Sequence, residues 1–250
     1  MTDSILKRKN APDIAYTFER GKQNLCVLFL HGWGSHRKRP KADAIMEVAR
    51  QAGVSFLSLD YTAHGESGGE PQLFTVGQGI QDAMDVINEV VPDTPLLIVG
   101  NSIGGWIGLW LAEELKRTVA FMGLAPAPDI TQAVWDKMMP DYAKAEIEKG
   151  NILGPAPETA GLCLTKQLFQ DGKNHYMLDS LINFNGPVRI LIGDKDERVE
   201  WDRIIRIKDR FTSADVMITL IKGADHHLSE PRDLLTIQKV LKDLITEGLK

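Results

Sequence analysis

The sequence predicts an α/β fold with one mainly parallel sheet flanked by helices, and two observations support this prediction. Short apolar runs rich in β-branched residues alternate with longer stretches of helical periodicity along most of the 250 residues. Several of these runs have no polar alternation, which is typical of parallel strands that helices cover on both faces. Because strand, helix and strand repeat, we expect right-handed crossovers that build a single sheet.

The predicted elements follow in chain order. An extra strand at 14–18 is expected to pair antiparallel at the sheet edge, and further strands are predicted at 25–30, 54–59, 96–99, 119–124, 188–192 and 216–221. Helices are predicted at 42–52, 75–90, 103–116, 202–211 and 232–249. The last helix has the clearest pattern, because Ile237, Leu241 and Leu244 share one face.

One long stretch interrupts this alternation. About sixty residues separate position 124 from position 188, far more than the roughly 2–6 residues usual in such a loop. Prolines punctuate the stretch, and 131–149 is predicted as a helix. Insertions at the strand ends of an α/β sheet lie where ligands bind. Residues 126–187 are therefore either an insertion without a function of its own or a lid over a pocket, and we expect a lid. The chain is then a single domain whose core is 1–125 and 188–250.

Composition and charge argue against several function classes. Apolar residues make up 43% and charged residues 25% of the chain, which is typical of globular proteins. The net charge of −5 argues against nucleic acid as a partner. No apolar run reaches the ~18–20 residues needed to cross a bilayer, and the polar residues 1–10 lack the apolar core of a secretory signal. We therefore expect a soluble, cytoplasmic protein without a membrane span.

The most informative segment is Gly100-Asn101-Ser102-Ile103-Gly104, a G-x-S-x-G pattern. An apolar run leads directly into it and a helical stretch leads directly out, which is the context of a nucleophile on a sharp strand-to-helix turn. Such a turn strains the backbone of Ser102 and favours glycine two residues to either side. It also sets Ser102 near the positive end of a helix, where developing negative charge is favoured. The alternative is a glycine-rich turn with an ordinary capping serine.

A serine nucleophile needs a base, and the base needs an orienting acid. In this architecture both follow the serine in the chain, each just after a later strand. Asp194 and Asp196 follow the strand at 188–192, and His226 and His227 follow the strand at 216–221. Three strand ends can therefore bring a serine, a carboxylate and an imidazole to one edge of the sheet.

These segments resemble the α/β-hydrolase family, and the resemblance covers nearly all of the chain. The G-x-x-D-x-x-V spacing at 193–199 matches the family's acid loop and favours Asp196 over Asp194. The G-x-x-H spacing at 223–226 matches its histidine loop and favours His226 over His227. The segment 30–34 is similar to its oxyanion loop, and 60–69 resembles the loop after the next strand with an altered glycine pattern.

The resemblance implies a small helical lid inserted after the sixth strand. It also implies a serine hydrolase that cleaves carboxylic esters or thioesters through an acyl-enzyme, without a cofactor or a metal. Ser102, Asp196 and His226 would be the catalytic triad, and the backbone N–H groups of Trp33 and Ile103 would form the oxyanion hole.

Within the family, the chain is most similar to mitochondrial acyl-protein thioesterases that also cleave acyl glucuronides, and to their bacterial relatives. The shared features are a compact lid, Gly104-Gly105-Trp106 after the nucleophile, and the Asp225-His226 pair. This similarity implies a small acyl ester or thioester as substrate, with acylated protein as a further possibility. The Arg-rich leader of a transit peptide is not seen at the start of the sequence, so the expectation is still a cytoplasmic location.

Several residues are candidates for contact with the substrate. Apolar side chains of the predicted lid are expected to line an acyl pocket, and the candidates are Trp135, Met138, Met139 and Leu162. His31 is a further candidate, although its ordinary role would be to brace the oxyanion loop. The basic run 36–41 is either a solvated loop or a patch that draws an anionic substrate.

Other functions stay open at this point. The same triad could serve a C–C bond hydrolase or a perhydrolase, and an α/β fold can also become a non-catalytic ligand receptor. A receptor would gain nothing from keeping nucleophile, acid and base together. A metal site at Asp225, His226 and His227 is disfavoured, because adjacent histidines lack the i, i+4 spacing of helical metal pairs.

Overall fold

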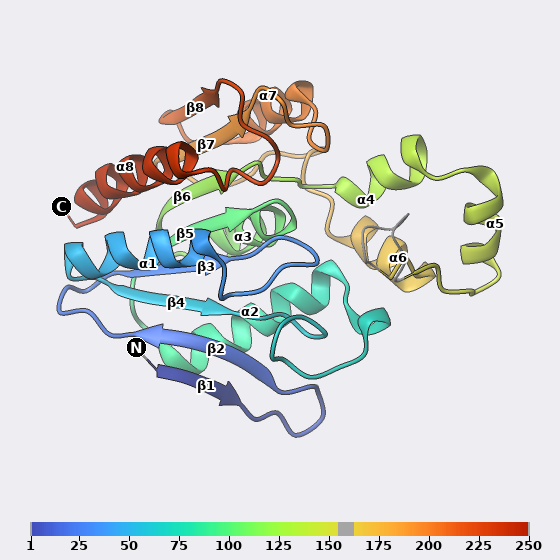
Figure 1. Ribbon diagram of the computed structural model, residues 1–250, viewed down its shortest axis with the longest axis horizontal. Coiled ribbons are helices and arrows are strands. Elements are labelled where there is room, and N and C mark those ends of the chain that lie inside the picture. Colours follow the sequence, from blue (N-terminus) through green and yellow to red (C-terminus); the bar gives the residue numbers. More distant parts are fainter. Residues whose placement is uncertain (1, 155–162, 250) are drawn as a thin grey trace.

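An eight-stranded sheet forms the centre of the molecule, with strand order β1-β2-β4-β3-β5-β6-β7-β8 (Figure 1). The computed structural model describes residues 2–154 and 163–249. β1 pairs antiparallel with β2, and β2 pairs antiparallel with β4, whereas all other neighbours are parallel. The predicted α/β class with a mainly parallel sheet is confirmed.

The strands have the bounds β1 (Thr2–Leu6), β2 (Ile14–Glu19), β3 (Cys26–Leu30), β4 (Ser55–Leu59), β5 (Leu96–Asn101), β6 (Thr118–Leu124), β7 (Val188–Gly193) and β8 (Val216–Ile221). The helices of the core are α1 (Pro40–Ala52), α2 (Val76–Val90), α3 (Ile103–Glu114), α7 (Trp201–Arg210) and α8 (Pro231–Gly248), with a short 3-10 turn, η1 (Pro71–Leu73). β1 was not predicted, because this edge strand is mostly polar and exposed and carries no apolar period.

Helices cover both faces of the sheet and bury two apolar layers. α2, α3 and α7 pack on one face, and α1 and α8 pack on the other. β3 contributes to both layers, because Leu28 and Leu30 face the first while Val27 and Phe29 face the second. This two-sided burial is the reason that the central strands read as unbroken apolar runs. In the described part of the chain, no helix is both long enough and apolar enough to cross a membrane.

The insertion between β6 and β7 contains α4 (Ile130–Ala133), a π-helical turn η2 (Val134–Met138), α5 (Asp141–Glu148) and α6 (Lys166–Asn174). The predicted single helix over 131–149 is wrong. Met139 has extended backbone angles (φ −84°, ψ 127°), because the residue before a proline is disfavoured in the helical region and Pro140 lacks an N–H. Figure 1 shows the insertion beyond the carboxyl ends of the parallel strands. Its division at 126–187 and its role as a lid stay predictions.

Candidate active site

Ser102 lies on the tight turn between β5 and α3 and has a positive φ that is strained for a non-glycine residue (φ 54°, ψ −119°). Its N–H donates to the carbonyl of Leu124 at 3.0 Å, which ties the turn to the end of β6. A Cβ at Gly100 would collide with the backbone of α3, and a Cβ at Gly104 would collide with the carbonyls at the end of β3. Both glycines of the motif are therefore required by close backbone approach.

Three side chains from separate strand ends meet next to this turn. His226 Nε2 lies 3.0 Å from Ser102 Oγ. On the other side of the ring, His226 Nδ1 lies 2.9 Å from Asp196 Oδ2. The His226 residue is 8% exposed, so this chain of contacts is largely shielded from water. The arrangement can move a proton from the hydroxyl to the imidazole while a carboxylate orients the ring.

The Asp196 carboxylate is held by its own loop. Its Oδ1 accepts hydrogen bonds from the N–H groups of Arg198 and Val199, both at 2.9 Å. Burial raises the pKa of Asp196, but the hydrogen bonds from His226 and from these N–H groups outweigh burial and leave the pKa below its ordinary value. Asp194 instead accepts a hydrogen bond from the N–H of Gly223 and is exposed. The structure therefore brings Asp196, and not Asp194, to the imidazole.

The loop after β3 lies against the serine. A Cβ placed at Gly32 would lie 3.4 Å from Ser102 Cβ, so the backbone before Trp33 passes directly beside the nucleophile candidate. Trp33 and Ile103 both line the same cavity as Ser102. Ile103 is the first residue of α3, where an N–H has no carbonyl partner within the helix. The oxyanion-hole roles of the Trp33 and Ile103 N–H groups stay predictions.

His31 lies at the end of β3 and is 1% exposed. Its Nδ1 contacts the carbonyl of Gly32 at 2.8 Å, and its ring packs on Tyr61. Burial lowers the pKa of His31 to about 3, so the ring is neutral at physiological pH. His31 touches the cavity wall, and these contacts fit a residue that braces the loop.

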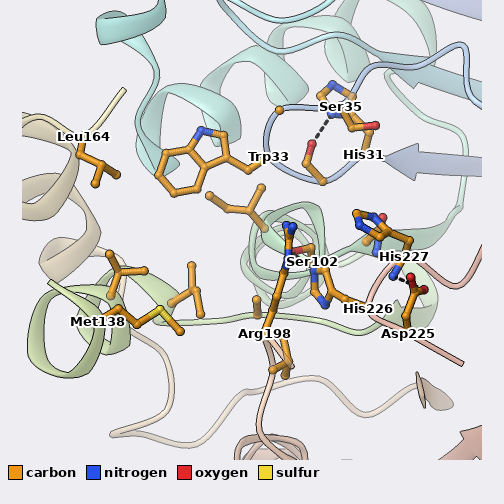
Figure 2. A pocket seen from close by; sticks show the side chains of 18 of the residues that line it. His31, Trp33, Ser35, Ser102, Met138, Leu164, Arg198, Asp225, His226 and His227 are labelled. Carbon is orange, nitrogen blue, oxygen red and sulfur yellow. Dashed lines mark hydrogen bonds between the residues drawn. The ribbon is translucent and has the colours of Figure 1, made fainter. Parts of the chain in front are cut away.

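A cavity of about 1240 Å³ opens above Ser102. Figure 2 shows Met138 and Leu164 of the insertion on one side and His226, His227 and Asp225 on the other, with Ser102 between them. Apolar side chains of the insertion dominate the first side, including Ile130, Val134, Met138, Met139 and Leu164. The second side carries Asp225, His226 and His227, and the charged residues Arg39, Lys41 and Glu230 also line the cavity.

The lid candidates have different positions. Met138 and Met139 line the cavity, and Leu162 lies outside the described residues. Trp135 does not line this cavity and packs instead on Phe169, with ring centroids 4.9 Å apart. The physical reason is helical direction, because Ile130, Val134 and Met138 recur on the cavity face and Trp135 points to a neighbouring one. An apolar composition alone could not distinguish these faces.

The basic run 36–41 divides into structural and cavity residues. Arg37 is 3% exposed and forms ion pairs with Asp60 and Glu66. Lys38 also pairs with Glu66, at 2.9 Å. These two cations therefore stabilise the loop and are not free to draw a substrate. The three other basic residues of the run line the cavity, and they are His36, Arg39 and Lys41.

In the described part of the chain, no three His, Cys, Asp or Glu side chains are grouped so that they could hold a metal ion. Asp225 accepts a hydrogen bond from the N–H of His227 at 2.9 Å, so it caps its own turn.

Comparison with known proteins identifies the family. Residues 27–236 match the Alpha/beta hydrolase family. The chain belongs to this family. The α/β-hydrolase sequence is 32% identical over 250 residues to "Palmitoyl-protein thioesterase ABHD10, mitochondrial" of Rattus norvegicus, covering 98% of this chain and 82% of the relative. It is 31% identical to the Homo sapiens protein of the same name, covering 97% of this chain and 79% of the relative.

Solved structures give the same result. The α/β-hydrolase matches the alpha/beta hydrolase domain-containing protein 10 from mouse with a TM-score of 0.86 and 31% identity, over 99% of both chains. It matches a putative hydrolase from Agrobacterium vitis S4 with a TM-score of 0.89 and 26% identity, over 98% of both chains. The resemblance to acyl-protein thioesterases is confirmed, and the names of the relatives support an enzyme that hydrolyses esters or thioesters.

The expected cytoplasmic location is wrong on this comparison. The relatives that match nearly the whole chain at 31–32% identity are all named mitochondrial. The expectation had relied on the composition of the first residues, which is a weaker criterion than these whole-chain matches.

Proposed function

We propose that this α/β-hydrolase cleaves carboxylic thioesters or esters through an acyl-enzyme formed on Ser102. The observation that supports it most is the pair of contacts from His226, at 3.0 Å to Ser102 Oγ and at 2.9 Å to Asp196 Oδ2. A hydroxyl, an imidazole and a carboxylate in this order are the parts that activate a serine at neutral pH.

In the first half-reaction, Ser102 Oγ attacks the acyl carbonyl carbon and its proton passes to His226 Nε2. The negative charge that develops on the carbonyl oxygen is stabilised by the N–H groups of Trp33 and Ile103, and each such donor typically lowers the barrier by about 3 kcal/mol. His226 then gives its proton to the leaving thiolate or alkoxide. In the second half-reaction His226 activates water, which releases the acid and restores Ser102.

The substrate class follows from the two sides of the cavity. The apolar side formed by the insertion suits a long acyl chain, because methionine and leucine side chains adapt to flexible aliphatic groups. A volume of about 1240 Å³ leaves room for a leaving group on the polar side as well. The relatives named palmitoyl-protein thioesterase favour a long-chain thioester, and an acylated protein is then a candidate substrate.

The test is Ser102→Ala, assayed with a long-chain acyl thioester and its matching oxygen ester. We expect kcat to fall at least ~10⁴-fold for both substrates, because removal of the nucleophile leaves only the binding contribution to catalysis. A fluorophosphonate probe should label the wild type and not the variant, whereas a ligand receptor should not be labelled. Ser35→Ala is the matched control, because Ser35 lines the same cavity. Turnover that survives in Ser102→Ala would contradict the proposal, whereas Ser35→Ala should keep its turnover.

A further inference from the structure

Lys41 is a buried cation in an unfavourable place. It is the second residue of α1, where the positive end of the helix dipole disfavours a cation, and it is 5% exposed. Among residues 2–154 and 163–249, no carboxylate lies within 4.0 Å of its Nζ. Burial lowers the pKa of Lys41 to about 8, against the weaker attraction of Asp225 and Asp233. Such a charge destabilises a fold, so its presence needs a reason other than packing.

The contacts of Lys41 lead to the nucleophile. Its Nζ donates to Asn101 Oδ1 at 2.9 Å. Asn101 Nδ2 donates in turn to the carbonyl of Leu124 at 2.8 Å, and the N–H of Ser102 donates to the same carbonyl at 3.0 Å. Asn101 directly precedes Ser102 in the chain. The ammonium therefore fixes the residue from which the strained turn at Ser102 starts.

The electrostatic partners of Lys41 include the residue that precedes His226, the proposed base. Asp225 directly precedes His226 and attracts the ammonium, as does Asp233 of α8. Burial lowers the pKa of the neighbouring His227, and the charge of Lys41 adds to this effect. Lys41 thus interacts with the residue before Ser102 and with the residue before His226. It also lines the catalytic cavity itself.

We propose that Lys41 is a positioning residue, whose ammonium holds the Asn101 side chain and attracts Asp225 and thereby fixes the approach of Ser102 Oγ to His226 Nε2. This inference rests on the proposed function, because the separation of these two atoms matters only if Ser102 is the nucleophile. A misplacement of about 1 Å in such a pair is expected to reduce the rate of the chemical step up to ~100-fold.

The test is Lys41→Met, which keeps a long side chain and removes the charge. We expect kcat for a neutral thioester and the rate of fluorophosphonate labelling both to fall at least ~tenfold, while KM stays within ~twofold. The Tm should stay equal or rise, because the variant loses a buried cation whose Nζ has no carboxylate of the described residues within 4.0 Å. Lys38→Met is the matched control, because Lys38 is a half-exposed cation of the same basic run 36–41 that pairs with Glu66 and lies outside the cavity wall.

Chemical rescue tests whether the charge of Lys41 or only the shape of its side chain is needed. In Lys41→Ala, added propylammonium should restore kcat at least ~threefold, because the cavity admits the small cation to the vacated position, and 1-propanol should not. A lowered Tm together with no rescue would show a merely structural role and overturn the proposal.

Two further outcomes would also overturn it. One is a Lys41→Met variant with wild-type kcat. The other is an unchanged kcat with a higher KM for anionic substrates alone, which would make Lys41 a substrate contact. Labelling of the wild type distinguishes a failure of the proposed function from a failure of the role proposed for Lys41. An unlabelled wild type contradicts the proposed function and this inference together, whereas a labelled wild type with a fully active Lys41→Met contradicts this inference alone.

Discussion

Two carboxylates two positions apart in the loop after β7 have different environments. Asp196 contacts His226 Nδ1 at 2.9 Å and accepts two backbone N–H groups, which keep it ionised. Asp194 is exposed and accepts a backbone N–H from the next loop. Only the first can hold the imidazole with Nδ1 protonated and Nε2 free to accept the serine proton.

The pair Asp196→Asn and Asp194→Asn tests this difference. An asparagine at 196 can donate its amide N–H to Nδ1, which shifts the proton to Nε2 and removes the base, so kcat should fall by about 10³–10⁴-fold. Asp194→Asn should change kcat by less than ~threefold. Steady-state hydrolysis of one thioester by both variants measures this, and the reverse order of effects would show that the acid is Asp194.

For single residues, local spacing in the sequence predicted the contact between Asp196 and His226. It could not predict which charged side chains are buried. The G-x-x-D-x-x-V and G-x-x-H patterns select Asp196 and His226 because each loop is short and its geometry depends on nearby glycines. The interaction of Lys41 with Asn101 joins residues 60 positions apart and depends on burial. For the same reason Arg37 appeared in the sequence as one of several exposed cations, although it is buried against Asp60. The catalytic roles themselves stay predictions.

At the scale of elements, the central strands and flanking helices were predictable and the insertion was only partly so. Apolar runs with helices between them identify β3 to β8, because burial on both faces leaves a strong signal. The polar edge strand β1 and the short helix α6 carry little signal. The helix predicted over 131–149 ends early because Pro140 interrupts it. Which apolar side chains of the insertion face the cavity depends on the phase of these short helices.

Met138→Trp tests the assignment of the acyl side of the cavity. Met138 is 57% exposed, so the larger ring can be accommodated without disturbing the core, yet it fills space in the cavity that Ser102 also lines. We expect kcat/KM for long acyl chains to fall at least ~tenfold and that for acetyl substrates to stay within ~twofold, because each excluded methylene loses about 0.8 kcal/mol of binding. A series of acyl thioesters of increasing length measures this.

Ile152→Trp is the matched control, because Ile152 is a 49% exposed residue of the same insertion and does not line the cavity. Equal chain-length profiles for Met138→Trp and the wild type would place the acyl group elsewhere.

At the scale of the whole molecule, the parallel order of β5, β6, β7 and β8 explains why distant residues meet. Each strand pairs with the next in parallel register, so the loops that follow β5, β7 and β8 leave the sheet at the same edge. Ser102, Asp196 and His226 follow these strands. The alternation of strands and helices was enough to predict this convergence, because right-handed crossovers leave few other arrangements. Cellular location, by contrast, did not follow from composition, and the whole-chain comparison corrected it.

Covalent trapping of the intermediate would show whether Ser102 becomes acylated during turnover. A p-nitrophenyl alkylcarbamate transfers its carbamoyl group to an activated serine, and the adduct hydrolyses slowly enough to accumulate. We expect a burst of about one p-nitrophenolate per chain and a carbamoyl mass on the peptide that contains Ser102. A carbamoyl group on another residue, or steady ester hydrolysis by a chain that never becomes modified, would contradict it.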